Sequence, residues 1–193
     1  MKLKILGSIL EKDKKAVAIV GSRQMSEYGK KQAYYFSSVL AKNGITIVSG
    51  LARGIDTIAH TAALDAGGRT IAVLGSGIDI IYPPENFDLV QKIAKNGAVV
   101  SQFPNGTPPL GKNFLIRNKL IVELSLAVVV IEGKRRSGTI STANYAANIG
   151  REVFAIPGQI DSELSQAPLF LIENGAQIAH SPETIIDYIN SLF

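Results

Sequence analysis

The sequence predicts an α/β domain with an extended Rossmann-like fold, in which helices cover both faces of a mostly parallel sheet. The main observation is that short apolar runs alternate with segments of helical periodicity along the chain. The first run, residues 16–20, is apolar at every position and stops at Gly21, as expected for a strand buried on both faces. The chain has 193 residues and no linker rich in Ser, Gly or Pro, which favours one domain over two.

The first half of the chain contains four expected strands and three expected helices. Residues 28–42 show an apolar helical face and stop at Asn43-Gly44. We expect Asp56 to be the N-cap of the next helix, which runs toward Gly67-Gly68. A third helix, at residues 86–96, is ended by Gly97. The expected strands of this half are residues 16–20, 45–48, 70–74 and 98–100.

The second half repeats the pattern. Residues 127–131 form a long buried strand, an Ala-rich helix at 139–148 is closed by Gly150, and another strand follows at 152–156. A final helix opens at Ser181-Pro182-Glu183, where cap, proline and acid stand in their preferred places. The proline-containing stretch at 102–111 is expected to be an irregular loop, and such loops are often functional. The order of the strands does not follow from the sequence.

The composition excludes several classes of function. The chain has no cysteine, so disulfides, thiol nucleophiles and thiolate zinc sites are ruled out, and its two histidines disfavour a His-rich metal site. We therefore expect no metal and no other cofactor. No signal-peptide pattern and no apolar stretch of about 20 residues is present, which predicts a cytoplasmic protein without a membrane partner. The net charge of +4 leans toward an anionic partner.

Glycine-containing polar segments follow four of the expected strands. In parallel sheets, ligands bind beyond the carboxyl ends of the strands. Glycines allow a close approach of the backbone, hydroxyls and N–H groups at helix starts bind anions, and Arg23 and Arg53 supply forked donors for phosphate. We interpret the segments as a phosphate-binding rim, although each one alone is also compatible with an ordinary tight turn. They are residues 21–23, 49–56, 75–79 and 132–139.

Residues 112–119, Lys-Asn-Phe-Leu-Ile-Arg-Asn-Lys, form a second group of interest. One aromatic among basic and amide side chains suits single-stranded nucleic acid, because the ring stacks on a base while Arg and Lys hold phosphates. The same residues also fit a solvated helix start with Phe114 packed in the core. The residues alone leave both readings open.

The remaining polar residues favour binding over catalysis. His60 lies among apolar residues of its helix and is expected to be structural, and His180 is expected at the surface. The acids Asp56, Asp79 and Glu85 form no readable acid–base pair with one another or with Glu132, which we expect to brace the rim. Neither G-x-G-x-x-G nor G-x-x-x-x-G-K-[ST] occurs, so a standard dinucleotide or ATP site is not supported.

Several short motifs between about residues 16 and 179 resemble, in this order, those of the DNA-processing protein A family (DprA, also called Smf). The S-G-x-A-R-G-I-D stretch is highly specific, and the match spans nearly the whole chain. The motifs are Gly-Ser-Arg at 21–23, Ser-Gly-Leu-Ala-Arg-Gly-Ile-Asp at 49–56 with Ala59-His60, Tyr82-Pro83, Phe-Leu-Ile-Arg-Asn at 114–118, Ser-Gly-Thr at 137–139 with Thr142-Ala143, and Gly-Arg-Glu-Val-Phe-Ala-Ile-Pro-Gly at 150–158.

The resemblance implies a protein without catalytic activity that binds single-stranded DNA, loads the RecA recombinase onto it during natural transformation, and forms a homodimer. It implies phosphate contacts by Arg23, Arg53 and Lys119 and base contacts by Phe114 and Asn118, with Arg117 shaping the pocket. The complete set of expected DNA-binding residues is Gly21, Ser22, Arg23, Ser49, Gly50, Arg53, Gly54, Lys112, Phe114, Arg117, Asn118, Lys119, Ser137, Gly138 and Thr139.

The chain also departs from the family pattern. The family commonly has Glu at the position of Gln102, Arg at Lys119 and a basic residue at Pro84, and residues 165–169 lack the expected Gly and Asn. We expect a basic N-terminal segment at 1–15 and a single Rossmann-like domain at 16–193. The family's N-terminal helical domain and C-terminal winged-helix-like domain are expected to be absent.

Two other functions remain alternatives. The first is a nucleoside-monophosphate phosphoribohydrolase resembling the LOG proteins, whose P-G-G-x-G-T-x-x-E signature carries a catalytic Glu. Thr142 stands at that position here, which argues against hydrolysis without excluding nucleotide binding. The second is a sensor that binds a small nucleotide in the rim and signals through oligomerisation.

Overall fold

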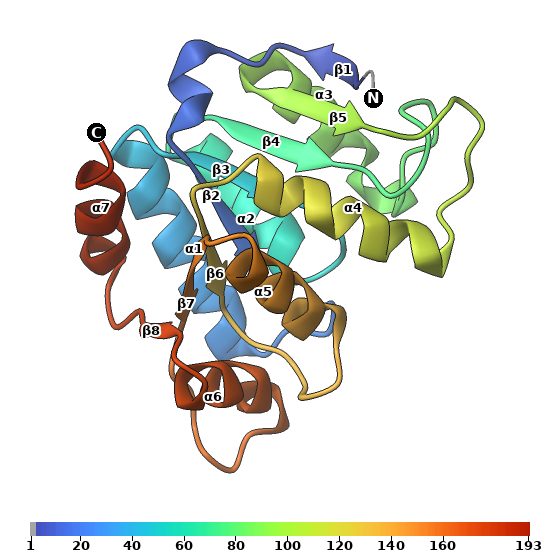
Figure 1. Ribbon diagram of the computed structural model, residues 1–193. Helices are drawn as coiled ribbons and strands as arrows, with labels where there is room; N and C mark the ends of the chain where they lie inside the picture. The colour runs from blue at the N-terminus through green and yellow to red at the C-terminus, as the bar shows by residue number, and fades with distance from the viewer. Residues whose placement is uncertain (1–2) are drawn as a thin grey trace.

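The computed structural model describes residues 3–193 as one sheet with helices on both faces (Figure 1). Its strands are β1 (Lys4–Gly7), β2 (Ala16–Val20), β3 (Thr46–Ser49), β4 (Thr70–Val73), β5 (Ala98–Ser101), β6 (Ala127–Val130), β7 (Glu152–Ala155) and β8 (Gln177–Ile178). They are ordered β1-β5-β4-β3-β2-β6-β7-β8. Every neighbouring pair is parallel except β1 and β5, which run antiparallel. The predicted fold class is confirmed.

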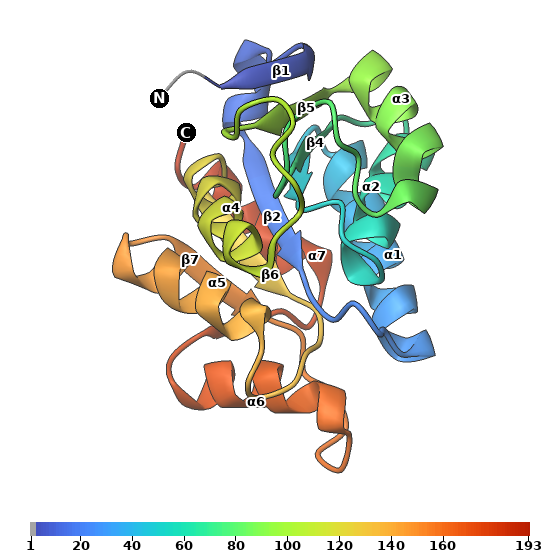
Figure 2. The ribbon, with the colours of Figure 1, turned by 90° about the vertical axis from the view of Figure 1, so that its right-hand side faces the viewer.

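The helices form two layers on the sheet. The α-helices are α1 (Glu27–Lys42), α2 (Ile55–Asp65), α3 (Phe87–Asn96), α4 (Gly111–Glu123), α5 (Gly138–Asn148), α6 (Gln166–Glu173) and α7 (Pro182–Asn190), and the short 3-10 turns are η1 (Glu11–Lys14), η2 (Pro84–Asn86) and η3 (Glu163–Ser165). One layer, with α1, α2, α3 and α7, packs on the opposite face from the layer with α4, α5 and α6. Figure 2 shows α1, α2 and α3 on one side of the sheet and α4 and α5 on the other.

Alternate side chains of each central strand enter opposite layers of the core. On β2, Val17 and Ile19 pack toward α1 and α2, whereas Ala18 and Val20 pack toward α4 and α5. All five residues of this strand are buried. This two-sided burial explains why the strand is a continuous apolar run and not an alternating one. Among the described helices, none is long and apolar enough to span a membrane.

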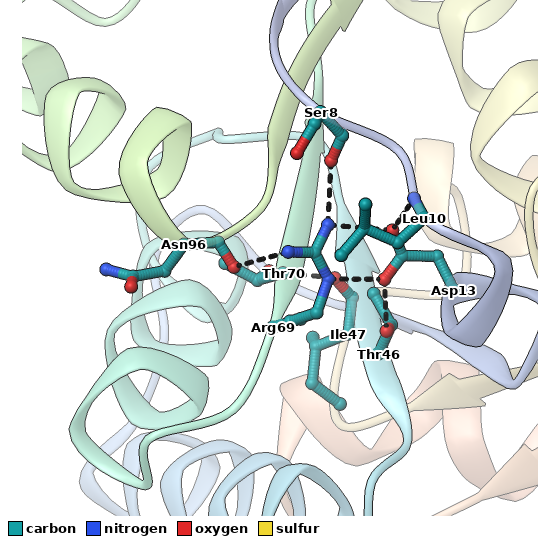
Figure 3. Close-up of polar contacts among 8 residues, drawn as sticks. All are labelled: Ser8, Leu10, Asp13, Thr46, Ile47, Arg69, Thr70 and Asn96. Carbon is teal, nitrogen blue, oxygen red and sulfur yellow. Dashed lines mark hydrogen bonds and ion pairs between the residues drawn. The ribbon is translucent and has the colours of Figure 1, made fainter.

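A buried ion pair ties the N-terminal segment to the sheet (Figure 3). Arg69, which directly precedes β4, donates through Nε and Nη2 to the carboxylate of Asp13 in η1, at 2.7 and 2.8 Å. The Thr46 hydroxyl donates to the same carboxylate at 2.8 Å, and Arg69 also donates to the Ser8 carbonyl at 2.7 Å. Burial alone would raise the pKa of Asp13, but these hydrogen bonds hold it below its usual value.

Several elements differ from the sequence-based expectation. The segments β1, α6 and β8 were not predicted, and α4 was one of two readings left open for residues 112–119. Strand β1 adds an antiparallel edge to the sheet from within the basic N-terminal segment, of which residues 1 and 2 lie outside the described residues. The expected N-cap role of Asp56 is wrong. Helix α2 begins after Gly54, and the Asp56 carboxylate accepts hydrogen bonds from the Gly50 and Ala52 N–H groups of the preceding loop.

Candidate functional site

A cleft of about 780 Å³ opens at the carboxyl ends of β2 and β6. These strands are neighbours, but the chain continues from β2 into α1 on one face and from β6 into α5 on the other. Such a divergence leaves a crevice, which is the usual ligand site of an open α/β sheet. Most of the predicted binding residues line it, namely Gly21, Ser22, Arg23, Arg53, Phe114, Arg117, Asn118, Ser137, Gly138 and Thr139.

The Phe114 ring forms part of the cleft wall and is half-buried, which is intermediate between the two readings that the sequence left open. One face lies against the backbone of Gly75, where a Cβ atom would stand 2.6 Å from the ring atom Cδ1. The guanidinium carbon of Arg23 lies 4.8 Å from the ring centroid, and the Tyr82 ring lies 5.8 Å away. The ring is therefore held in place while part of it remains accessible from the cleft.

Several basic side chains line the cleft. Arg53 makes a forked pair with Glu85 at 2.5 and 3.2 Å, with both side chains 53% exposed, and Lys134 pairs with Glu163 at 2.8 Å. Among residues 3–193, no carboxylate forms an ion pair with Arg23 or Arg136. Two guanidinium groups at the cleft are thus free to bind an anion.

The N-terminus of α5 forms the opposite side of the cleft. Ser137 precedes the helix, and its Oγ is buried without a hydrogen-bond partner among the described residues. Gly138 and the buried Thr139 follow in the first turn. The Asn118 amide approaches from α4, 3.8 Å from where a Cβ on Gly138 would lie. Unpaired N–H groups and a positive helix end favour a phosphate oxygen at this point.

A buried guanidinium supports the cleft from below. Arg117 is 3% exposed and donates to the carbonyls of Gly50 and, at 2.7 Å, Val73, while its Nε donates to Asn118 Oδ1 at 3.0 Å. Burial lowers the pKa of Arg117 to about 10, so the group stays charged at neutral pH. Burial also raises the pKa of Asp56, against the opposing charge of Arg117. Arg117 therefore positions Asn118 and the loop after β3.

Five predicted binding residues lie outside this cleft. Ser49 is fully buried and donates to the Ile19 carbonyl at 2.6 Å. The Gly50 carbonyl accepts a hydrogen bond from Arg117, and Gly54 precedes the first residue of α2 with a φ of 77°. Lys112 and Lys119 are exposed on α4, and Lys119 lies 5.5 Å from the Tyr145 ring centroid. Their proposed contacts with DNA stay predictions.

The rim contains three of the four glycine segments expected there. Residues 75–79 instead join the proline-containing loop, because Gly77 bridges to Phe103 and the Asp79 carboxylate accepts the Gly106 N–H at 3.0 and 3.1 Å. Glu132 accepts the Ser26 N–H and hydroxyl at 2.8 and 2.7 Å and so holds the start of α1, while its bracing of the rim stays a prediction. The other cleft residues were not among the expected DNA-binding residues: Val20, Gln24, Ala52, Asp56, Gly111, Leu115, Ile121, Gly133, Lys134, Arg136 and Thr142. Several of them, including Lys134 and Arg136, lie within the segments that were predicted to form the rim.

The two histidines lie where the sequence indicated. His60 is fully buried, with Nδ1 2.6 Å from the Thr70 hydroxyl, and His180 is exposed. Burial and the nearby charge of Arg117 lower the pKa of His60 to about 3, so the imidazole is neutral in the folded protein. Within residues 3–193, no three His, Cys, Asp or Glu side chains gather as metal ligands would.

Comparison with known proteins identifies the family. The family described as DNA recombination-mediator protein A matches residues 1–190. The chain belongs to this family. Protein Smf of Escherichia coli is 46% identical over 172 residues, which are 89% of this chain and 46% of that protein. The chain spans about half the length of the curated relatives that it matches.

Solved structures of two family members share the fold closely. The X-ray structure of DNA processing protein A from Streptococcus pneumoniae superposes with a TM-score of 0.91 at 42% identity, covering 96% of this chain and 65% of that one. DNA processing protein A from Helicobacter pylori, whose structure concerns its single-stranded DNA binding mode, gives a TM-score of 0.86 at 32% identity, covering 98% and 86%. The DprA/Smf resemblance of the motifs is confirmed.

Proposed function

We propose that the cleft binds single-stranded DNA and that the chain acts as a recombination mediator that loads RecA onto that strand during natural transformation. The observation that carries the proposal is the position of Phe114. Its half-buried ring lies in a cleft with the free guanidinium group of Arg23 beside the ring and that of Arg136 next to the N-terminus of α5. An unpaired base stacks on such a ring while its phosphates meet the positive groups.

The same arrangement favours a single strand over a duplex. A base that stacks on Phe114 must be unpaired, because the ring is set within a cleft and half-buried. The N-terminus of α5 carries the Ser137 hydroxyl, which has no hydrogen-bond partner among the described residues. This helix end suits a single phosphate group and not the two phosphate backbones of a duplex. The single-stranded DNA binding mode studied for the Helicobacter pylori relative supports this choice.

The finer parts of the proposal concern partners and catalysis. RecA as partner, a homodimer as the functional unit and a cytoplasmic location are proposed from the family resemblance. We also propose that the protein acts by binding and not by catalysis. Thr142, at the position of the phosphoribohydrolase glutamate, donates its hydroxyl to the Gly138 carbonyl at 2.9 Å, and Asp56 is committed to backbone N–H groups.

Fluorescence anisotropy with a labelled oligo-dT, at two salt concentrations and beside a duplex of equal length, tests the proposal. We expect tight binding that prefers the single strand and a log–log salt slope of about −0.7 per phosphate neutralised. Equal or stronger binding of the duplex would contradict it. Release of free base from a nucleoside monophosphate, without affinity for the oligonucleotide, would favour the phosphoribohydrolase instead.

A further inference from the structure

A second concave surface lies outside the cleft, on the outer face of α1. It encloses about 460 Å³ between α1 and the first turn of α2. Two tyrosines, 44% and 46% exposed, and two exposed lysines form most of it. This α1 groove is lined by Glu27, Lys30, Lys31, Tyr34, Tyr35, Ser38 and Ile58.

The helical period explains why these side chains gather. Residues that are three, four or seven positions apart share a helix face. Lys31, Tyr34 and Tyr35 therefore lie on one stripe of α1 that starts at Glu27. The opposite face of α1, with Ala33, Phe36 and Leu40, is buried in the core. The tyrosines and lysines are therefore not needed for packing the helix against the sheet.

Contacts within the protein fix the orientation of the rings in advance. The Tyr34 hydroxyl donates to Asp65 of α2 at 3.2 Å, and the Tyr35 ring packs edge-to-face on Phe36 with centroids 5.7 Å apart. Tyr28, six residues before Tyr34 and 44% exposed, donates to the Pro157 carbonyl at 2.6 Å. Rings that are already ordered lose little conformational freedom when a ligand stacks on them.

The α1 groove begins close to the cleft along the chain. Gln24 lines the cleft, and Ser26 caps α1 only two residues later. Figure 2 shows the loop that leaves β2 running from the carboxyl edge of the sheet into the first turn of α1. From Glu27 to Ser38 the helix extends about 16 Å, at 1.5 Å per residue. A strand that leaves the cleft beside this loop thus meets a surface with room for several nucleotides.

We propose that the α1 groove is a second segment of the single-strand binding site, where bases stack on Tyr34 and Tyr35 and phosphates meet Lys30 and Lys31. Interleaved aromatic and basic side chains are the chemistry that binds single strands without sequence preference. The proposal rests on the proposed function of the cleft. It predicts that long oligonucleotides bind more tightly than those that fill the cleft alone.

The test compares two lengths of oligo-dT, about 6 and about 20 nucleotides, by anisotropy. The double variant Tyr34→Ala/Tyr35→Ala is expected to bind the long strand at least about fivefold more weakly and the short one as the wild type does. Lys30→Ala/Lys31→Ala is expected to lower the salt slope for the long strand alone, by about 0.7 for each phosphate that the lysines no longer neutralise. Glu27→Gln, which removes a negative charge, is expected to raise the affinity for the long strand.

Matched controls lie on α3, away from both surfaces. Phe87→Ala removes an aromatic side chain that is 55% exposed, and Lys92→Ala/Lys95→Ala removes two exposed lysines. Thermal unfolding establishes that each variant is folded. If the groove variants weakened binding of both oligonucleotide lengths equally, or of neither, the proposed binding role of the α1 groove would be wrong. Binding of the short strand by the wild type would still support the cleft. If the wild type bound neither length, the cleft and the groove would both be wrong.

Discussion

The guanidinium carbon of Arg23 lies 4.8 Å from the centroid of the Phe114 ring. The two side chains come from the loop after β2 and from α4, so this contact joins the two walls of the cleft. A base that enters the cleft meets both at once, as a ring to stack on and a cation to hold its phosphate.

Replacing the ring is the most direct test of stacking. Phe114→Ala is expected to weaken binding of oligo-dT by about 1–3 kcal/mol, or roughly 5- to 150-fold, because base–aromatic stacking has that magnitude. Phe114→Tyr should retain most of the affinity, since the ring is kept. Anisotropy titrations measure both, with the exposed Phe87→Ala as the control. Unchanged binding by Phe114→Ala would contradict a stacking role.

Gly75 is expected to affect the affinity for oligo-dT without contacting the oligonucleotide. A Cβ atom there would come within 2.6 Å of the Phe114 ring and push it from its position. Gly75→Ala is therefore expected to weaken binding, and to add little once Phe114 has been removed, since contacting residues are not additive. A double-mutant cycle on oligo-dT affinity measures this coupling. Fully additive effects would mean that Gly75 acts on something other than the ring.

If Arg53 binds a DNA phosphate as proposed, Glu85 is expected to compete for it. The pair is exposed and its hydrogen bonds are 2.5 and 3.2 Å long, so a phosphate must displace the carboxylate to use the same donors. Glu85→Gln is expected to raise oligo-dT affinity by roughly two- to fivefold, in keeping with the small free energy of an exposed pair. Arg53→Gln should lower affinity, and the double variant should resemble Arg53→Gln. A loss of affinity in Glu85→Gln would show that the pair positions Arg53 instead.

His60 makes folding sensitive to mild acid. Its pKa is about 3 in the folded protein, because of burial and the charge of Arg117, against about 6.5 in an unfolded chain. Below pH 6.5 only the unfolded state takes up the proton, so this contribution to stability is complete above pH 6.5 and falls toward pH 3. Urea denaturation at several pH values should show a flatter profile for His60→Gln between pH 4 and 6. Parallel profiles would refute this assignment.

The Asp13–Arg69 pair should stabilise the N-terminal edge. Arg69→Met leaves a carboxylate that is 4% exposed without its cation, which is expected to cost a few kcal/mol of unfolding free energy. Because the folded pKa of Asp13 is lowered, the contribution is present above its usual value of 3.8 and lost as the pH falls below it. Urea denaturation at neutral pH measures the loss, and Asp13→Asn in the same background should restore part of it.

The central strands could be predicted because burial on both faces requires a continuous apolar run. Most of the helices could be predicted from their helical periodicity and the glycines that end them. Strand β1 was missed because Lys4–Gly7 neither alternates nor forms such a run, and its place depends on pairing with β5. Helix α4 entered only as the helix-start reading of residues 112–119, because Arg117, a charged residue, occupies a buried position that a sequence pattern assigns to an apolar one. Strand β8 has only two residues.

The candidate site was predicted less evenly. Residues at strand ends and helix starts, such as Arg23 and Ser137, converge because parallel strands end at one edge. Lys112 and Lys119 do not line the cleft, because the face that a side chain occupies on α4 depends on how that helix packs against α5. The buried ties of Arg117 to the Gly50 and Val73 carbonyls join segments far apart in sequence, which no local pattern reveals.

The central place of β2 affects the order in which the molecule can assemble. Val17 pairs with Ala127, so strand β6 closes the sheet only after 110 further residues have been synthesised. Without β6, a half-sheet of β2 to β5 would leave the edge of β2 open to other chains, and such non-local pairing is slow. This nascent species is the one that a chaperone would need to protect. The cleft takes its walls from both halves of the sheet, so a ligand bound across it would hold those halves together.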